Sequence, residues 1–344
     1  MGCDDKGIHS VIDRQGELSI RGRREYNDGF AAEFHSPVSR GRVPMFKSNR
    51  AAPGPAWIAA CVRCTVLLTL LGSASNILAD EPPVKEVQHR VTFYAMGDVP
   101  YTPAEDVLLP QQISELPHDA EFVVHVGDIK GGGSPCNEAV YVKVSDMLSK
   151  AAAPVFIIPG DNEWNDCVDP DPIQAWSHWK KHFMRFDQRW QHNLPVFRQL
   201  EREENFSFVR NGVLFIGLNI VGGRIHDATE WKQRHGECLD WVRRNLSQFG
   251  DKVSSLVIFG HAKPAAMHAD FFDPLNDDAQ KFSKPMLYLQ GDGHRWIHDR
   301  PFAAKNILRV QVDQGGIAPP LKVTVTDHPT EPFVFDRRIP ASGQ

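Results

Sequence analysis

The sequence predicts an α/β fold, and two observations support this prediction. Short apolar runs recur along the chain and end in glycine followed by a polar residue, which is typical of buried strands closed by a turn. Segments with helical spacing of apolar residues lie between several of these runs, as in parallel α/β units. Polar side chains at the carboxyl ends of such strands stand where open α/β sheets bind ligands. We therefore expect a functional site at one sheet edge.

Five apolar runs are interpreted as strands. They cover residues 91–96, 122–126, 155–158, 256–259 and 286–290. Each run delivers an aspartate or a histidine to a strand end, in the motifs Gly97-Asp98, Gly127-Asp128, Gly160-Asp161-Asn162-Glu163, Gly260-His261 and Gly291-Asp292-Gly293-His294.

Helices are expected between and after these strands. Thr102 followed by Pro103 is a typical helix start, with the threonine as cap and the proline in the first turn. Residues 138–151 place apolar side chains on one face, and residues 176–190 and 231–246 also fit helices.

Two strand pairs are expected in the second half of the chain. Asn211-Gly212 between residues 206–209 and 213–218 is a strong hairpin signal. Residues 307–312 and 321–325 are predicted to form a closing antiparallel pair.

The N-terminal part differs from the rest of the chain. Residues 1–44 carry scattered charge without apolar periodicity, and we interpret them as a disordered tail or an over-extended N-terminus. Residues 45–79 run from a basic segment through an apolar one to small residues, as in a secretory signal peptide. A membrane anchor is the alternative, although Arg63 interrupts the apolar stretch. Residues 80–344 are then a single exported domain, periplasmic, extracellular or at the cell surface, and associated with a membrane only if the signal segment is uncleaved.

The composition is that of a globular protein. The 344 residues are 42% hydrophobic and 24% charged, with a formal net charge of −5. An acidic chain without a basic stripe of interleaved aromatic residues lacks the electrostatic footprint of a nucleic-acid-binding protein. We therefore expect no nucleic-acid partner, while the oligomeric state is left open.

Three of the six cysteines, Cys136, Cys167 and Cys238, fall in the predicted domain. Cys136 follows the Asp128 loop and Cys167 follows the Asp161 loop, and both loops are expected at the same sheet edge. Because an exported protein permits disulfides, we expect a Cys136–Cys167 bridge. Three free buried thiols are the alternative.

Carboxylates and imidazoles at several strand ends indicate a site for hard or borderline divalent cations. The sequence has no Gly-x-Ser-x-Gly motif, no phosphate-cradling Gly-Lys-Ser/Thr motif and no dinucleotide-binding fingerprint. A serine nucleophile and a nucleotide cofactor are therefore not expected.

The ordered set of five motifs resembles the calcineurin-like metallophosphoesterase superfamily. The likeness runs from about residue 91 to about residue 325, and the order is more specific than any single Gly-Asp pair. The resemblance implies a four-layer sandwich of two mixed β-sheets flanked by helices, with a two-metal site at the strand ends.

The resemblance also implies metal ligands. Asp98 stands where the family has a carboxylate on one metal, and Asp128 where a carboxylate bridges both metals. Asp161 stands where the family usually has an asparagine on the second metal, and His261 matches a histidine ligand of that metal.

The remaining positions depart from the family pattern. Asp292 and His294 stand where the family has a Gly-His-x-His pair, with one histidine for each metal. Pro100 occupies the place of the first motif's histidine ligand, and Asn162 that of the catalytic histidine. Tyr101 offers a phenolate, as in the purple acid phosphatases, where the tyrosine belongs to the second motif. The implied cofactors are two divalent ions, for which this carboxylate-rich set favours Mn, Fe, Mg or Ca over Zn. A single-metal or inactive site is the alternative.

Four residues beside the ligand positions are candidate catalytic groups. Lys130 and Arg295 directly follow ligand motifs and are expected to contact a phosphate, with solvated surface charge as the alternative. Asn162 stands in the catalytic position, and Glu163 is expected to orient Asn162 or a ligand. Further cationic or imidazole candidates are His125, which fits a hydrogen-bonded core residue better, His226, Lys263 and His268.

These observations lead to three functional hypotheses. The first is metal-dependent hydrolysis of a small phosphomonoester or phosphodiester by a metal-activated water. The second is a secreted metal- or ligand-binding protein that kept the fold and lost the chemistry, as suggested by Pro100 and Asn162. The third, a nuclease of the same superfamily, is disfavoured by the acidic net charge.

Overall fold

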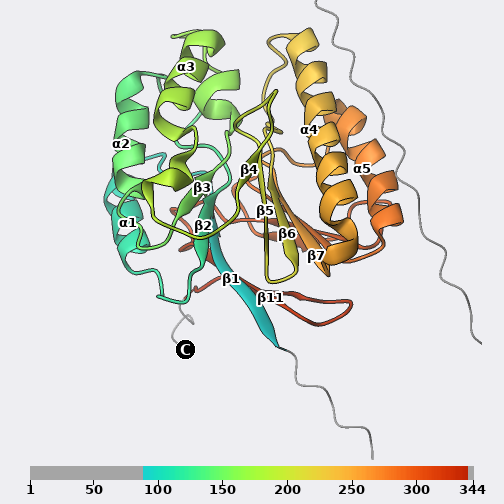
Figure 1. The fold of residues 1–344 in the computed structure, drawn as a ribbon. Helices are drawn as coiled ribbons and strands as arrows, with labels where there is room; N and C mark the ends of the chain where they lie inside the picture. Colours follow the sequence, from blue (N-terminus) through green and yellow to red (C-terminus); the bar gives the residue numbers. More distant parts are fainter. Residues whose placement is uncertain (1–87, 340–344) are drawn as a thin grey trace, which may run out of the picture. The chain divides into compact units, whose positions relative to one another are not determined.

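The computed structural model describes residues 88–339, so the predicted tail and signal segment lie outside the described residues. Two mixed β-sheets stack face to face, and helices cover both outer faces (Figure 1). The predicted four-layer α/β sandwich is therefore confirmed. Within residues 88–339, no helix combines the length and the apolar character needed to cross a bilayer.

The first sheet has five strands in the order β12-β11-β1-β2-β3. Strands β1, β2 and β3 are parallel, whereas β11 runs antiparallel to β1 and β12 antiparallel to β11. The strands are β1 His89–Met96, β2 Phe122–His125, β3 Val155–Ile157, β11 Leu321–Thr326 and β12 Phe333–Asp336.

The second sheet has seven strands in the order β4-β5-β6-β7-β8-β10-β9. Its centre, β6 to β8 with β10, is parallel, and the edge strands β4, β5 and β9 are antiparallel to their neighbours. The strands are β4 Phe197–Arg198, β5 Phe206–Arg210, β6 Val213–Gly217, β7 Ser255–Phe259, β8 Met286–Gln290, β9 Ile297–Asp299 and β10 Ile307–Gln311. The expected hairpin is β5 and β6.

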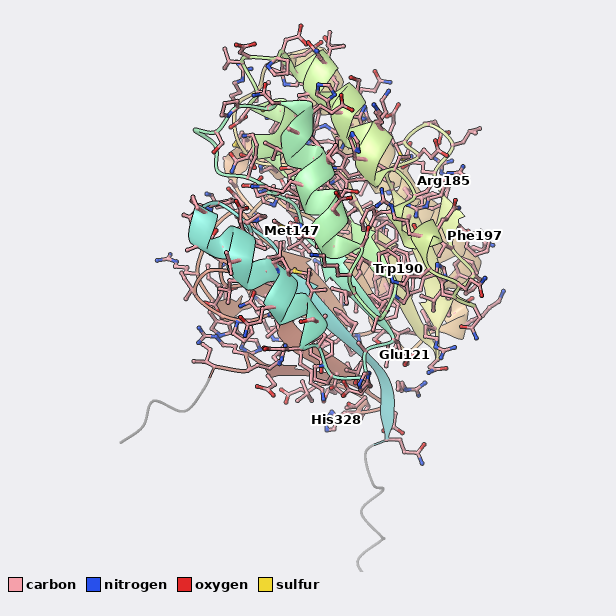
Figure 2. All side chains as sticks on the ribbon, turned by 90° about the vertical axis from the view of Figure 1, so that its left-hand side faces the viewer. Glu121, Met147, Arg185, Trp190, Phe197 and His328 are labelled. Atoms are coloured by element: carbon pink, nitrogen blue, oxygen red, sulfur yellow. A yellow bond between two sulfur atoms is a disulfide. The ribbon has the colours of Figure 1, made fainter. Side chains whose placement is uncertain are left out.

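Three helices pack on the first sheet and two on the second. Figure 2 views the molecule from the side of α1, α2 and α3 and shows these helices side by side over the five-stranded sheet. Helices α4 and α5 cover the outer face of the seven-stranded sheet. The helices are α1 Pro103–Ser114, α2 Glu138–Leu148, α3 Pro172–Phe183, α4 Ala228–Phe249 and α5 Ala269–Phe282, with short turns η1 Asp161–Asn165, η2 Phe186–Arg189, η3 Gly250–Lys252 and η4 Ala266–His268.

An aromatic core joins the two sheets. Phe122 on β2 is fully buried and stacks on Phe93 of β1 with ring centroids 5.0 Å apart. Its ring also makes edge-to-face contacts with Phe208 and Phe215 of the opposite sheet, at 5.3 and 5.2 Å. Such contacts add to the free energy gained by burying each ring, so this cluster fixes how the two sheets stack.

The predicted closing antiparallel pair is wrong. Strand β10 pairs with β8 and β9, whereas β11 pairs with β1 and β12, so the two strands belong to different sheets. Both strands point apolar side chains into the space between the sheets, for example Val310 and Val323. A strand in either sheet can bury its apolar side chains in this shared core. The alternation of apolar and polar residues therefore does not show to which sheet a strand belongs.

The predicted helix boundaries also needed correction. Helix α3 begins at Pro172 rather than at residue 176, because the Asp171 side chain accepts a hydrogen bond from the Gln174 amide and caps the first turn. Helix α4 begins at Ala228, with Asp227 as its cap. Helix α5 was not predicted from the sequence.

The predicted Cys136–Cys167 disulfide is present in the structure. It joins the loop before α2 to the loop before α3, and its two cysteines are 2% and 3% exposed. The bridge closes a sequence separation of 31 residues, which in the chain-entropy model stabilises the fold by about 3–4 kcal/mol. Cys238 is a buried free thiol.

The substitution Phe122→Ala is expected to lower the free energy of unfolding by about 3–5 kcal/mol, because it leaves a cavity between the sheets. Urea unfolding followed by circular dichroism measures this loss. Val107→Ala on α1 is the control, since that side chain is 74% exposed. An equally small loss for both variants would contradict the proposed role of the aromatic core.

Candidate metal centre

Loops from both sheets meet at one place, beyond the carboxyl ends of the parallel strands. The Asp98 amide donates to the Gly127 carbonyl at 3.0 Å, which joins the loops after β1 and β2. The Asp292 amide, after β8 of the other sheet, donates to Asp98 Oδ1 at 3.1 Å. His261, after β7, faces Asp128 across the same space. The polar residues after these strands therefore share one site, as the strand-end pattern predicted.

Glycine before the aspartates lets two of these loops touch. A Cβ atom at Gly160 would lie 2.2 Å from the amide nitrogen and Oδ1 of Asp128. Gly127 has φ +91°, and a Cβ there would lie 2.6 Å from the Gly160 backbone and 2.7 Å from His261 Nδ1. Only glycine fits at both positions, which explains why the motifs read Gly-Asp.

Four of the predicted ligands have left-handed backbone conformations. The φ angles are 55° at Asp98, 63° at Asp128, 67° at Asp292 and 60° at His294. Such conformations are uncommon for residues other than glycine and concentrate at functional sites. The fold thus accepts backbone strain at residues that are expected to be metal ligands.

Asp98, Asp128 and His294 form a first group whose ligand atoms lie within 4.8 Å of one another. Asp98 is fully buried, whereas the His294 side chain is 47% exposed. His294 Nε2 lies 3.3 Å from Asp98 Oδ1. This group therefore faces solvent on the side of the histidine.

Asp128, Asp161 and His261 form a second, buried group, also within 4.8 Å. Nδ1 of His261 lies 2.7 Å from the Val126 carbonyl, so it is the nitrogen placed to donate a hydrogen bond. Nε2 of the same ring lies 3.0 Å from Asp161 Oδ1 and 3.3 Å from Asp128 Oδ1. A histidine that donates one N–H to a carbonyl and points the other nitrogen at carboxylates has the arrangement of a metal ligand.

Tyr101, which the sequence suggested as a possible phenolate but not as one of the metal ligands, reaches into the first group. Its hydroxyl donates to Asp128 Oδ2 at 2.7 Å and lies 3.2 Å from Asp98 Oδ1 and 3.3 Å from His294 Nε2. Glu105 fixes the tyrosine backbone, because its side chain accepts hydrogen bonds from the Tyr101 and Thr102 amides. The signals in the sequence were the phenolate that Tyr101 offers and the adjacent Pro100, which has no ligand atom.

Asn162 and Glu163 hold Asp128 in place. The Asn162 amide nitrogen donates to Asp128 Oδ1 at 3.0 Å, and its side chain donates to Asp128 Oδ2 and to the Tyr101 hydroxyl. Glu163 is fully buried, and its Oε1 accepts from the amides of Gly160 at 2.6 Å and Asp128 at 3.3 Å. Glu163 thus holds the Asp128 loop from behind.

The other three predicted site residues lie around the two groups without joining them. Asp292 places its carboxylate 3.4 Å from Lys263 Nζ. Lys130 is buried, and its amine donates to the Gly131 carbonyl at 3.1 Å. The Arg295 side chain is exposed, and its carbonyl accepts a hydrogen bond from Gln311.

The imidazole candidates outside the two groups are engaged elsewhere. His125 is fully buried with Nε2 bonded to the Val99 carbonyl, as expected for a core histidine. His226 bonds to the Asn165 side chain at 3.0 Å. His268 is buried, stacks on Trp231, and lies 3.5 Å from His235.

Burial and like charges disturb ionisation throughout the site. Burial raises the pKa of Asp98 and raises that of Asp161 to about 6. Burial and the neighbouring Asp128 raise the pKa of Glu163 to about 8. Burial opposes protonation of His261, but Asp128 and Asp161 outweigh it and lift its pKa well above the ordinary value. Without bound cations, keeping these buried carboxylates ionised therefore costs free energy.

The donor set fits divalent cations. Asp98 Oδ2 is buried and has no hydrogen-bond partner among the described residues, while Asp161 Oδ1 and His261 Nε2 face each other as a buried ion pair at 3.0 Å without a well-aligned hydrogen bond. Buried polar atoms are nearly always satisfied, so poorly satisfied atoms gathered in one place call for a physical reason. Carboxylate oxygens with imidazole nitrogens suit Mn, Fe or Mg, and each group offers three such ligands.

The sequence matches the family model described as calcineurin-like phosphoesterase over residues 92–296. No curated protein matches the chain. Among solved structures, it is similar to GAP50, the anchor in the inner membrane complex of Plasmodium, with 11% identity and a TM-score of 0.46, covering 73% of this chain and 89% of that one.

Two further similar structures are longer proteins. For the purple acid phosphatase PPD1 from yellow lupin seeds, identity is 15% and the TM-score 0.44, over 68% of this chain and 49% of that one. For the 5'-nucleotidase from Candida albicans, identity is 14% and the TM-score 0.44, over 72% and 51%. The chain thus spans about half the length of each.

Because His125 is buried, we predict that the protein loses stability in mild acid. Burial lowers its pKa from the ordinary 6.5 to about 4. The unfolded chain therefore binds more protons between these values, so the contribution is complete above pH 6.5 and is lost as the pH falls toward 4. We expect His125→Gln to reduce the drop in unfolding free energy between pH 7 and pH 5 by roughly 2 kcal/mol. Urea unfolding at both pH values measures it.

The matched control is His118→Gln, which changes an exposed histidine. It should keep the pH dependence of the unmodified protein. If His125→Gln keeps that dependence as well, another group causes the acid sensitivity.

Proposed function

This chain belongs to the calcineurin-like phosphoesterase family, and we propose that it hydrolyses a phosphate ester of a small molecule with divalent cations held by the two groups. One observation supports this most strongly: Asp128 belongs to both groups, so its carboxylate is placed to bridge two cations. In such a pair, divalent cations activate a water molecule and stabilise the charge of the phosphoryl oxygens.

We propose that Asp98, Asp128 and His294 hold one cation, and that Asp128, Asp161 and His261 hold the other. The bond between His261 Nδ1 and the Val126 carbonyl fixes the ring and keeps Nε2 directed at the carboxylates. Because His294 is the exposed member, substrate reaches the pair from its side.

Tyr101 is proposed as a further ligand of the first cation, in place of the histidine that Pro100 replaces. Oxygens around a cation with bonds of about 2.1 Å are separated by roughly 3 Å. The tyrosine hydroxyl lies 2.7 to 3.3 Å from Asp128, Asp98 and His294, which is this spacing. Burial and the neighbouring carboxylates raise the pKa of Tyr101, so its hydroxyl is protonated without a cation, and binding as the phenolate would release that proton.

Asn162 changes what the site can do for the leaving group. Its amide donates hydrogen bonds to Asp128 and Tyr101 but has no acidic proton to transfer. We propose that Asn162 positions the bridging carboxylate, and that the site favours esters whose leaving group departs without protonation. Aryl phosphates and phosphodiesters with acidic alcohols fit this requirement.

The same asparagine also supports a second candidate function, a metal- or ligand-binding protein without turnover. The two candidates share the cation site and differ in whether a phosphate ester is cleaved. For either function we propose that residues 80–344 act as one exported domain, and the Cys136–Cys167 disulfide supports export because disulfides persist in oxidising compartments.

Hydrolysis of nitrophenyl phosphate in the presence of Mn²⁺, Fe²⁺ or Zn²⁺ tests the proposed activity. We expect turnover with at least one cation, and a loss of about 10²–10⁴-fold in Asp128→Asn because the shared ligand is weakened. A series of aryl phosphates should show rates that fall steeply as the leaving group becomes more basic.

The matched control is Asp277→Asn, which alters an exposed aspartate on α5. No turnover with any cation would favour the binding function. Turnover that survives unchanged in Asp128→Asn would refute the proposed cation pair.

A spectroscopic measurement tests Tyr101. Protein loaded with Fe³⁺ should absorb in the visible range, because a phenolate bound to ferric iron gives a charge-transfer band. We expect Tyr101→Phe to abolish the band, whereas Tyr94→Phe, which removes a hydroxyl bonded to Asp119, should keep it. An unchanged band in Tyr101→Phe would show that Tyr101 is no ligand.

A further inference from the structure

Lys263 and Asp292 form an ion pair at the edge of the metal centre. Lys263 Nζ lies 3.4 Å from Asp292 Oδ2. Each residue is two positions away from a proposed ligand, since Lys263 follows His261 and Asp292 precedes His294. The pair therefore links the loop after β7 to the loop after β8, beside both groups.

The Asp292 carboxylate takes part in neither three-residue group. Its amide supports the first group by donating to Asp98 Oδ1, while its side chain is directed to Lys263. This arrangement differs from the metal-ligand role that the family resemblance implies. Asp292 thus contacts the metal centre through its backbone amide, whereas its side chain contacts Lys263.

The pair lies close to the second group. A Cβ atom at Gly222 would be 3.2 Å from Asp292 Oδ2 and 3.4 Å from Asp161 Oδ1, so both carboxylates border the same glycine. The Lys263 side chain is 57% exposed, whereas that of Asp292 is 18% exposed. The ammonium group therefore stands at the solvent side of the site, anchored by a partly buried carboxylate.

The negative charges of the site explain why a positively charged side chain beside it would help to bind phosphate. Asp98, Asp128 and Asp161 already crowd the site with carboxylates, and Asp292 adds another. A phosphate ester brings further negative charge, and a cation close to its oxygens offsets the repulsion. Lysine binds phosphate as a point charge on a flexible stem, so it reaches an oxygen without a preset geometry.

We infer that Lys263 contacts a phosphoryl oxygen of the ligand, and that Asp292 is its positioning residue rather than a metal ligand. This inference rests on the proposed function, because it assumes that a phosphate group binds at the cation pair. Lys263 adds electrostatic attraction and takes no part in bond making or breaking.

Titration calorimetry of inorganic phosphate into the Mn²⁺-loaded protein tests the inference without turnover, and elemental analysis of each variant gives its metal content. Lys263→Ala should weaken phosphate binding by about 10- to 100-fold, the usual value of a hydrogen bond to a charged group. Lys263→Arg should recover most of the affinity. Asp292→Asn should weaken phosphate binding by a smaller factor, and all three variants should keep their manganese.

Lys281→Ala provides a matched control, because Lys281 forms an equally long 3.4 Å ion pair with Asp278 on α5. It should leave phosphate binding unchanged. The double variant of Lys263→Ala and Asp292→Asn should bind phosphate no more weakly than Lys263→Ala alone, since Asp292 acts through the lysine.

Three results would overturn the inference: no phosphate binding to the unmodified protein, unchanged affinity in Lys263→Ala, or loss of manganese in Asp292→Asn. The last result would make Asp292 a ligand. A protein that binds phosphate through Lys263 but cleaves no ester would refute the proposed hydrolysis and leave this inference standing.

Discussion

The structure depends on one constraint, which is the placement of the buried Asp128 carboxylate between two groups of potential ligands. Burial opposes its ionisation, yet the neighbouring His261 and hydrogen bonds from Asn162 and Tyr101 lower its pKa. Asp98 and Asp161 approach from either side, and burial raises the pKa of each. Cations between these carboxylates would replace repulsion by attraction, so the same arrangement that is costly for the protein alone becomes favourable when ions bind.

The fold is built to hold that arrangement. Parallel strands of two sheets end at one place, and the aromatic core around Phe122 fixes how the sheets stack. Glycine at position 160 allows the loops to touch, and Glu163 ties Gly160 and Asp128 together from behind. Asp128 has a left-handed backbone conformation, which is uncommon for aspartate. The local backbone therefore accepts strain in order to place the carboxylate.

Sequence reasoning recovered the strands and the Gly-Asp ends, because a buried run closed by glycine is a local signal. It also found the Cys136–Cys167 bridge, since two loops at one sheet edge must lie near each other. It missed the sheets to which β10 and β11 belong, which depend on distant partners. It named Tyr101 only as a possible phenolate and Asp292 as a metal ligand. The contacts of Tyr101 with Asp128 and of Asp292 with Lys263 were missed, because they depend on loop conformations that spacing does not encode.

The central claim is that Asp128 is shared by two cations, and anomalous X-ray diffraction from crystals grown with Mn²⁺ tests it most directly. The account predicts two anomalous peaks, one on each side of the Asp128 carboxylate, with the first beside Asp98 and His294 and the second beside Asp161 and His261. Peaks elsewhere in the molecule, or none at these residues under saturating Mn²⁺, would contradict it.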